Sequence, residues 1–544
     1  MARENRLIAA LCVMILILDA WIVAGALGTT EFDDAFMVAR YAAHFLEGHG
    51  FSWNTADGPS FGVTSPGHLI VVTAIMALSE WNDAEVISVA SYGAGYLALI
   101  AMAALCLLVQ RAAGKQVTWR PVLLIPTLLV LSPFHYHCVT GMDTMLSLLA
   151  NAMLACATVV LSWKPTYRTL LLCSVVAVFA FVARPDNGVY SMLLPPLYLM
   201  ARNRHSWRWA CCFLGLTSVG LVAALVAFHL AFGDFLPLPI YAKRTGFLAG
   251  YTGAYQWNAM REMLVFHTGS VAFTIAAVAT VQRSAASRVA AALIPAGLTF
   301  AFFTTIVQVM GWNARFYVPS LPWIVLAAMT AMAEYSRPRE MRSFNRGSVA
   351  RLLVIGVLAM MAFPGPHQRA LVKWWQHHVI GPPRVELPQT RYHILSGYRV
   401  EKLGWKTSVM GIADLLELVP PEVVIAASEH GIIGSRQKDR TIIDLLGLHD
   451  RTIAHRGFDS SYLMDRHPDL IWMPNSDYTA TIAAILDDPI FKRTYDFYPG
   501  LYDYGIAIRI DGHHRDSLKA ALVSELNRIY GVSAIEPFQA FPDR

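Results

Sequence analysis

The sequence predicts a polytopic α-helical membrane protein that carries a mixed α/β domain at its carboxyl end. Hydrophobic residues make up 55% of the 544 residues and charged residues 15%, whereas a soluble globular chain carries roughly 25% charged residues. From about residue 384 the composition becomes that of an ordinary soluble domain, with strand-like apolar segments between helical ones. The net charge of +5 is small and concentrates in short loops, so it indicates membrane orientation and not nucleic-acid binding.

About eleven apolar segments are predicted to cross the membrane. The first, 7–27, follows Arg3 and Arg6 in the manner of a signal peptide. It is about 20 residues long and lacks a clear small-residue cleavage site, so we expect an uncleaved first helix. The expected spans are 7–27, 86–109, 121–135, 143–161, 169–183, 188–201, 209–232, 262–281, 289–310, 317–335 and 349–364.

The loops between these segments alternate in charge. By the positive-inside rule the basic loops are cytoplasmic, and the acidic loops lie on the outer face. The alternation holds only if the apolar stretch 67–79 does not cross. At about 13 residues, that stretch is too short for a span and fits an interfacial or re-entrant helix. We therefore expect a multi-pass inner (plasma) membrane protein with a cytoplasmic amino terminus and an extracytoplasmic carboxyl terminus.

The chain is expected to form two domains. Residues 1–364 would be the membrane domain, with a large first outer loop at 28–85, and residues 365–544 the extracytoplasmic α/β domain. Pro- and Gly-rich turns punctuate the linker between the two domains. In the second domain, strands are predicted at 423–427, 470–473 and 504–510.

An acidic pair, Asp33-Asp34, follows the first span. Two adjacent carboxylates at a membrane surface are costly to desolvate, so we expect them to contact water, to bind a cation or to take part in proton transfer. Mutual repulsion and the low-dielectric boundary raise at least one pKa, which suits a general base. The pair could instead bind a divalent cation such as Mg²⁺ or Mn²⁺, or simply cap the following helix.

Cations occur in three successive outer loops. Arg184 precedes a proline at a helix break, where its guanidinium could hold a phosphate through two hydrogen bonds. The alternative is an arginine that extends toward the interface and pairs with Asp186. Lys243 and Arg315 offer the second and third cations. Such a set suits a site for an anionic lipid-linked donor.

Three further outer-loop motifs have simple structural explanations. Thr64-Ser65 precedes Pro66 and has the pattern of a turn followed by a helix cap. Asp143 could cap the helix that begins beside it. His135 and His137 could each bind a metal ion, but two histidines alone do not complete a metal site, so interfacial packing explains them better.

Taken in order, these motifs resemble those of C-type glycosyltransferases, integral membrane enzymes that use polyprenyl-phosphate sugars. The first outer loop is similar to the catalytic loop of that family: the acidic pair is followed by Arg40-Tyr41, Glu47-Gly48-His49-Gly50, Asn54 and Thr64-Ser65-Pro66. Other similar motifs are Gly141-Met142-Asp143-Thr144 (with Asp in place of the usual Glu), Arg184-Pro185-Asp186, Tyr241-Ala242-Lys243 and Arg315-Phe316-Tyr317-Val318-Pro319. Segments 444–448, 453–454 and 468–471 resemble the extracytoplasmic domain of the family.

The closest group is the mycobacterial-type terminal arabinofuranosyltransferases. The resemblance implies inverting transfer of a sugar, with arabinofuranose favoured, from a polyprenyl-phosphate donor to a hydroxyl of a cell-envelope glycan, lipid or protein. It implies that Asp33 or Asp34 is the base, and Asp33 is slightly favoured as the first member of the motif. For donor-phosphate or substrate binding it implies Arg40, Tyr41, His49, Thr64, Ser65, Asp143, Arg184, Asp186, Tyr241, Lys243 and Arg315.

Two other functions are weighed against this enzyme. A lipid-linked-sugar transporter or flippase would place charges at mid-span and broken helices in matching halves, whereas here the polar residues collect at loop edges. A non-catalytic cell-envelope assembly protein would use its outer domain to bind polymer. Substitution of Asp33 and Asp34 without a change in expression would separate that protein from the enzyme.

Overall fold

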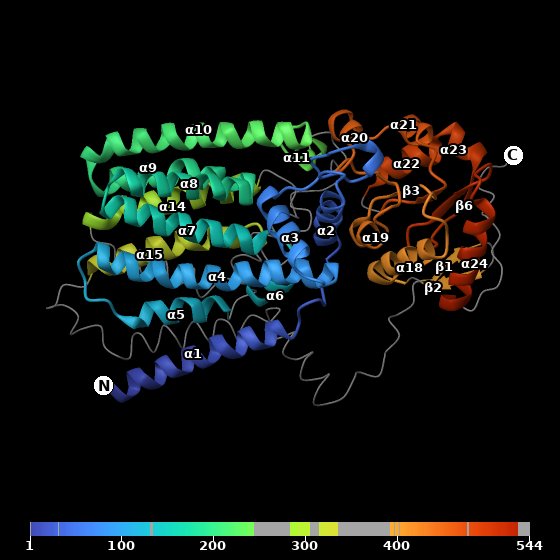
Figure 1. The fold of residues 1–544 in the computed structure, drawn as a ribbon. Helices are drawn as coiled ribbons and strands as arrows, with labels where there is room; N and C mark the ends of the chain where they lie inside the picture. Colours follow the sequence, from blue (N-terminus) through green and yellow to red (C-terminus); the bar gives the residue numbers. More distant parts are fainter. Residues whose placement is uncertain are drawn as a thin grey trace.

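The predicted fold class is confirmed: the chain forms a bundle of apolar helices followed by a mixed α/β domain (Figure 1). The computed structural model describes residues 2–30, 32–130, 134–243, 283–304, 315–335, 392–395, 398–401, 403–475 and 478–530. The expected spans at 262–281 and 349–364, and the linker, lie outside these ranges. The domain boundary near 364 therefore stays a prediction.

Among the described residues, the bundle consists of helices that run side by side (Figure 1). Within the described residues, five helical segments are long and apolar enough to cross a membrane: Arg6–Ala24, Asp83–Ala112, Thr144–Trp163, Arg204–Phe232 and Ala285–Phe303. The count of about eleven spans and the orientation of the termini stay predictions. The bundle helices are α1 (Ala2–Ala24), α4 (Asp83–Ala112), α5 (Trp119–Val130), α7 (Thr144–Trp163), α8 (Tyr167–Ala183), α9 (Gly188–Arg202), α10 (Trp207–Phe232), α14 (Arg283–Thr304) and α15 (Leu321–Tyr335).

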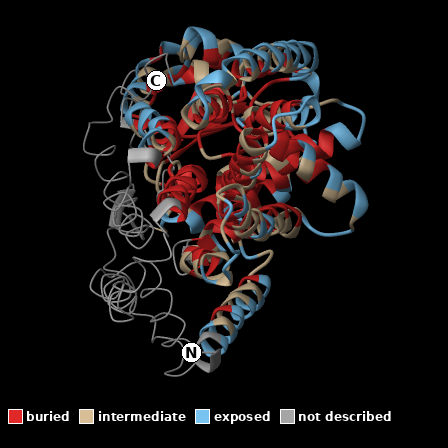
Figure 2. Ribbon diagram, turned by 90° about the vertical axis from the view of Figure 1, so that its left-hand side faces the viewer, coloured by how far each residue is buried: buried red, intermediate tan, exposed pale blue. Residues whose placement is uncertain are grey.

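Helix α7 lies at the centre of the bundle, and α1 and α10 lie at its edge. In the apolar segment of α7 78% of residues are buried, against 11% for α1 and 17% for α10; Figure 2 colours much of the ribbon near the amino terminus as exposed. Exposed apolar side chains such as Val219 and Leu230 are stable only against lipid or another apolar surface. Small residues let the inner helices approach closely: a Cβ on Gly95 would lie 2.6 Å from Cys138 Sγ.

Short helices cover the end of the bundle that faces the α/β domain (Figure 1). The stretch predicted as an interfacial helix is α3 (Pro66–Leu78), capped by Ser65, whose hydroxyl accepts from the His68 amide. Its position relative to a membrane stays a prediction. The other elements here are α2 (Asp33–Leu46), η1 (Thr55–Asp57), α6 (Phe134–Val139), η2 (Pro185–Asn187), α11 (Leu238–Ala242) and η5 (Val318–Ser320).

The α/β domain contains a five-stranded mixed sheet in the order β4-β3-β5-β7-β6. Strand β3 pairs in parallel with β4 and β5, and the other pairings are antiparallel. The three predicted strands are confirmed as β3 (Ile425–Ala427), β5 (Leu470–Trp472) and β7 (Ile506–Arg509). The remaining elements are β1 (Tyr392–Leu395), β2 (Tyr398–Glu401), β4 (Ile442–Asp444), β6 (Tyr495–Tyr498), α18 (Trp405–Glu417), α19 (Gly431–Arg436), α20 (Arg451–Arg456), α21 (Ser460–Asp465), α22 (Thr479–Asp487), α23 (Pro489–Thr494) and α24 (Arg515–Tyr530).

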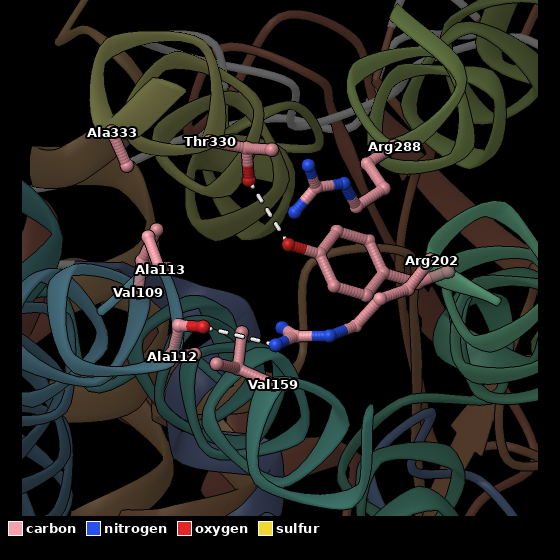
Figure 3. A pocket seen from close by; sticks show the side chains of 9 residues that line it. Val109, Ala112, Ala113, Val159, Arg202, Arg288, Thr330 and Ala333 are labelled. Carbon is pink, nitrogen blue, oxygen red and sulfur yellow. Dashed lines mark hydrogen bonds between the residues drawn. The ribbon is translucent and has the colours of Figure 1, made fainter. Parts of the chain in front are cut away.

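The opposite end of the bundle holds the amino terminus and a small cavity between helix ends (Figures 1 and 3). In this cavity, Arg202 Nη2 donates to the Ala112 carbonyl at 2.9 Å, and the Tyr198 and Thr330 hydroxyls lie 3.0 Å apart. The short helix η3 (Arg204–Ser206), which contains another arginine, begins two residues after Arg202. Basic side chains therefore lie at the end of the bundle remote from the α/β domain, and the side of the membrane that this end faces stays a prediction.

Candidate active site

The first outer loop docks onto the α/β domain through α2, which packs against α19. The Asp33 carboxylate is buried and accepts hydrogen bonds from the backbone amides of Gly431 (2.8 Å) and Ile432 (2.7 Å). The approach is so close that a Cβ on Gly431 would lie 1.9 Å from the Asp33 carbonyl oxygen. Both oxygens of Asp33 are thus used to hold the two domains together.

Arg40 forms the centre of the same contact. Its guanidinium donates to four carbonyl oxygens, and three of these belong to the α/β domain: Trp53 (2.6 Å), Gly434 (3.0 Å), Gln437 (2.7 Å) and Arg440 (2.7 Å). Burial without a carboxylate partner lowers the pKa of Arg40 to about 9. The assignment of Arg40 to the donor phosphate is therefore not supported, because its donors are already bonded to protein carbonyls.

The side chains that follow Arg40 in the loop extend the contact. Trp53 Nε1 donates to the Ile442 carbonyl at 3.0 Å, and Asn54 bonds both the amide and the carbonyl of Ile442. We call Asp33, Arg40, Trp53 and Asn54, with the α/β-domain groups that they bond, the docking interface. The hydrogen bonds between this loop and the α/β domain join residues far apart in the sequence, so neither local sequence pattern nor residue spacing could have predicted them.

The structure places four other predicted binding residues as follows. The Tyr41 hydroxyl is buried between Ser60 Oγ (2.9 Å) and His449 Nδ1 (3.0 Å). His49 and Thr64 are exposed. Ser65 caps α3 and donates to the Ala183 carbonyl, so the turn-and-cap explanation is confirmed for this residue. None of the four contacts the cations described next.

Asp143 lies between two arginines at the start of α7. Arg315 Nη2 lies 2.9 Å from Asp143 Oδ1, and Arg184 Nε lies 3.8 Å from Asp143 Oδ2. Arg184 also makes two 3.0 Å hydrogen bonds to Asp186, which is the pairing that the sequence offered as an alternative to a phosphate contact. The expectation that Asp143 caps a helix is wrong, because its side chain makes no capping bond.

The backbone around these charges is held by local chemistry. Residues before proline avoid the helical region, and Arg184 accordingly ends α8 in an extended conformation. Gly141 turns the chain at φ +74°, where a Cβ would lie 2.8 Å from Ile87 Cγ1. Asn151 of α7 donates both to Asn187 Oδ1 and to the Pro319 carbonyl, each at 2.9 Å. This amide therefore ties the Arg184 loop to the Arg315 loop.

Three buried polar atoms of this group have no hydrogen-bond partner among the described residues: Asp143 Oδ2, Arg184 Nη1 and Arg315 Nε. The Phe316 ring lies beside both guanidiniums, with its centroid 5.4 Å from Arg184 Cζ and 5.6 Å from Arg315 Cζ. Burial alone would raise the pKa of Asp143, but Arg184 and Arg315 lower it to about 2. The site thus holds ionised groups with unused hydrogen-bonding capacity, which is unusual for buried polar atoms.

Asp34 and Lys243 lie close to this group. Burial raises the pKa of Asp34, and the charges of Arg315 and Lys243 oppose that rise. The Lys243 ammonium also interacts with the charges of Arg184 and Asp186. Neither acidic residue of the pair caps α2 with its side chain, since the capping position is Phe32. We call Asp34, Asp143, Arg184, Lys243 and Arg315 the charged cluster.

The charged cluster differs from the expected site in composition. Tyr241 lies two residues before Lys243 in the sequence, but its ring packs against His455, with centroids 4.4 Å apart. Phe316 belongs to the motif that begins at Arg315, but the sequence did not predict that it lines the site. An aromatic residue directly after an outer-loop arginine was the only signal that could have identified it.

The chain is similar to one sequence family and to several solved structures. Residues 399–512 match a domain of unknown function (DUF8728), and no curated protein matches the chain. ArnT from Cupriavidus metallidurans bound to undecaprenyl phosphate gives a TM-score of 0.49 at 12% identity, over 92% of this chain and 97% of that chain. The apo state of ArnT gives 0.44 at 12% identity, over 93% and 98%. At this level of likeness, function must be inferred from the charged cluster itself.

Proposed function

We propose that the chain is a C-type glycosyltransferase that moves a sugar from a polyprenyl-phosphate donor to a hydroxyl acceptor at the outer face of the membrane. The observation that carries the proposal is the charged cluster. It places a carboxylate of raised pKa, Asp34, near Lys243 and Arg315. It also leaves guanidinium hydrogens of Arg184 and Arg315 without acceptors among the described residues, and an anionic ligand would satisfy these donors.

The proposed chemistry is a single displacement. The acceptor hydroxyl loses its proton to Asp34 and forms a bond to the anomeric carbon. The bond from that carbon to the phosphate oxygen breaks, and its electron pair leaves with polyprenyl phosphate. Arg184, Arg315 and Lys243 stabilise the charge on the leaving phosphate. One base and an activated leaving group suffice for inversion, so the reaction needs no carboxylate nucleophile.

Asp34 is the better candidate for the base, although the sequence slightly favoured Asp33. Both Asp33 oxygens accept backbone amides in a buried contact, so proton transfer through Asp33 would disrupt the docking interface. For the same reason we do not assign Mg²⁺ or Mn²⁺ to the acidic pair, because Asp33 is engaged and Asp34 lies near cations. Arabinofuranose remains the favoured sugar by resemblance alone, and the acceptor is a cell-envelope glycan, lipid or protein.

The test is a transfer assay on protein purified in detergent, with a panel of polyprenyl-phosphate sugars that includes the arabinofuranose donor. Asp34→Asn should lower turnover by on the order of 100-fold or more, the usual scale for a positioned general base. Glu80→Gln is the matched control, because Glu80 is an exposed carboxylate of the same outer loop. Near-normal turnover in folded Asp34→Asn protein would remove Asp34 as the base. Absence of transfer from every donor, with movement of the lipid across vesicles, would favour the flippase.

A further inference from the structure

Three side chains of the α/β domain converge at the docking interface, at the carboxyl ends of two parallel strands. His430 follows β3, Asp444 ends β4, and His449 lies five residues further on. Because β3 and β4 are paired neighbours, their carboxyl ends bring these residues together. One ligand-type atom from each residue lies within 4.8 Å of the other two, and all three side chains are buried.

The ring of His430 has a fixed tautomer. Its Nδ1 lies 2.9 Å from the Ser428 carbonyl, which can only accept, so Nδ1 carries the proton and Nε2 presents a lone pair. That Nε2 lies 3.9 Å from Asp444 Oδ1 and has no hydrogen-bond partner among the described residues. A metal-binding histidine has this arrangement, in which the second ring nitrogen donates to a carbonyl or carboxylate.

His449 has the matching arrangement. Its Nδ1 lies 3.0 Å from the Tyr41 hydroxyl, which can accept from it while donating to Ser60 Oγ. Its Nε2 has no hydrogen-bond partner among the described residues. The ring also stacks on Trp53, with centroids 4.0 Å apart and 10° between the planes. Residues of the first outer loop therefore hold this imidazole in place.

Asp444 completes the group. Its two oxygens accept the amides of Leu446 (2.8 Å) and His449 (2.6 Å), which fix the carboxylate and leave lone pairs free. When both rings carry their proton on Nδ1, two imidazole lone pairs and a carboxylate lie together in a buried space, and neither Nε2 has a donor among the described residues. Such a set of atoms repels itself unless a cation, or a water that donates to it, lies between them.

We propose that His430 Nε2, His449 Nε2 and the Asp444 carboxylate bind a divalent transition-metal ion, with Zn²⁺ as the best-fitting ion. Two imidazoles and one carboxylate form a typical three-ligand zinc set with a fourth position for water or another ligand. The metal is distinct from the charged cluster. By fixing His449 against Tyr41 and Trp53, it braces the α/β domain against the first outer loop.

The direct test is metal binding by the full chain in detergent. Protein stripped with a chelator is dialysed against Zn²⁺, and bound zinc is measured by mass spectrometry. We expect roughly one tightly bound zinc ion per chain, a higher melting temperature with zinc than without it, and a visible absorption spectrum typical of nitrogen–oxygen coordination when Co²⁺ replaces zinc. A folded wild-type chain that binds no zinc above background would overturn the proposal and leave a bridging water as the occupant.

Variants locate the ion. His430→Gln and His449→Gln should each abolish stoichiometric binding, whereas His513→Gln, a change to an exposed histidine of the same domain, should not. Tyr41→Phe keeps all three ligands and removes only the partner of His449 Nδ1. It should weaken zinc affinity by about 10- to 100-fold, the usual effect of losing an outer-shell partner. Zinc stoichiometry unchanged in the two ligand variants would place the ion elsewhere and refute the site, even if either variant were less stable.

Discussion

The docking interface and the charged cluster meet at the first turn of α2 but differ in how their polar atoms are used. In the docking interface Arg40 donates to four carbonyls and Asp33 accepts two amides, so a demanding set of buried groups is satisfied by protein alone. In the charged cluster, Asp143, Arg184 and Arg315 each leave a buried atom without a partner in the part of the chain that the structure describes. The first pattern is that of a structural joint, and the second is that of a site built for a ligand.

The difference separates two residues that are adjacent in sequence. Consecutive residues of an α-helix point about 100° apart, so Asp33 and Asp34 at the start of α2 face different regions. Asp33 faces α19 of the α/β domain, and Asp34 lies near Lys243 and Arg315. A short acidic motif therefore supplies one structural and one candidate chemical group.

The largest effect is expected from a substitution that breaks the docking interface. Arg40→Ala leaves four carbonyls without their donor. At roughly 1 kcal/mol of net stability per hydrogen bond lost, the free energy of unfolding should fall by about 4 kcal/mol. Thermal unfolding in detergent and the rate of proteolysis of the α/β domain should both report this loss. If Arg40 instead held the donor phosphate, the variant would unfold normally and only its use of donor would change.

The next effect tests the charged cluster as a phosphate site. Alanine at Arg184, Lys243 or Arg315 removes a charge-assisted contact worth roughly 1.5–3 kcal/mol. The donor concentration for half-maximal rate should then rise by about 10- to 150-fold, with a smaller change in acceptor dependence. Arg184→Lys should not restore donor use fully if the contact is bidentate.

Of these three alanine variants, Lys243→Ala is the clearest test of phosphate binding. Arg184 and Arg315 pair with carboxylates, so their removal also disturbs stability, whereas no such pair is seen for Lys243 among the described residues. Arg493→Ala, at an exposed cation of α23, is the control. Unchanged donor dependence in all three cluster variants, with lower stability alone, would reduce these cations to structural ion pairs.

Much of the fold could be predicted because hydrophobic segments and strand patterns are local signals. The apolar segments, the helix over 66–78 and the strands β3, β5 and β7 all follow from neighbouring residues. The docking interface could not be predicted, because Arg40 and its acceptors lie up to 400 residues apart in the chain. Asp33 and Asp34 look alike in sequence, and only the position of α19 distinguishes them.

A smaller effect separates the two regions within the acidic pair. Asp33→Asn keeps the shape of the side chain but replaces one accepting oxygen with an amide that cannot accept from a backbone N–H. The free energy of unfolding should fall by about 1–3 kcal/mol, while turnover of the folded fraction changes little. Loss of turnover at full stability would identify Asp33 as the base and would contradict the distinction between the docking interface and the charged cluster.

The smallest effect concerns pH and again distinguishes the pair. Burial raises the pKa of Asp34 above its ordinary value of 3.8, with Asp33 adding to the rise and Arg315, Lys243 and His430 opposing it. A base must be deprotonated, so turnover should fall about tenfold per pH unit below the pKa of Asp34. The acid limb should therefore appear at higher pH than an ordinary aspartate would give, and the residual rate of Asp34→Asn should lack it.

The same shift has a definite sign for stability. A carboxyl group that binds its proton more tightly in the folded state contributes stability below the pKa of the unfolded chain and loses it as pH rises through the folded pKa. Ionised Asp34 therefore destabilises the fold at neutral pH, and Asp34→Asn should melt at the same temperature as wild type or slightly higher. Asp33→Asn should melt lower at the same pH. Parallel melting curves at neutral and acidic pH check this contrast: a lower melting temperature for Asp34→Asn at neutral pH would show that Asp34, too, belongs to the structural joint.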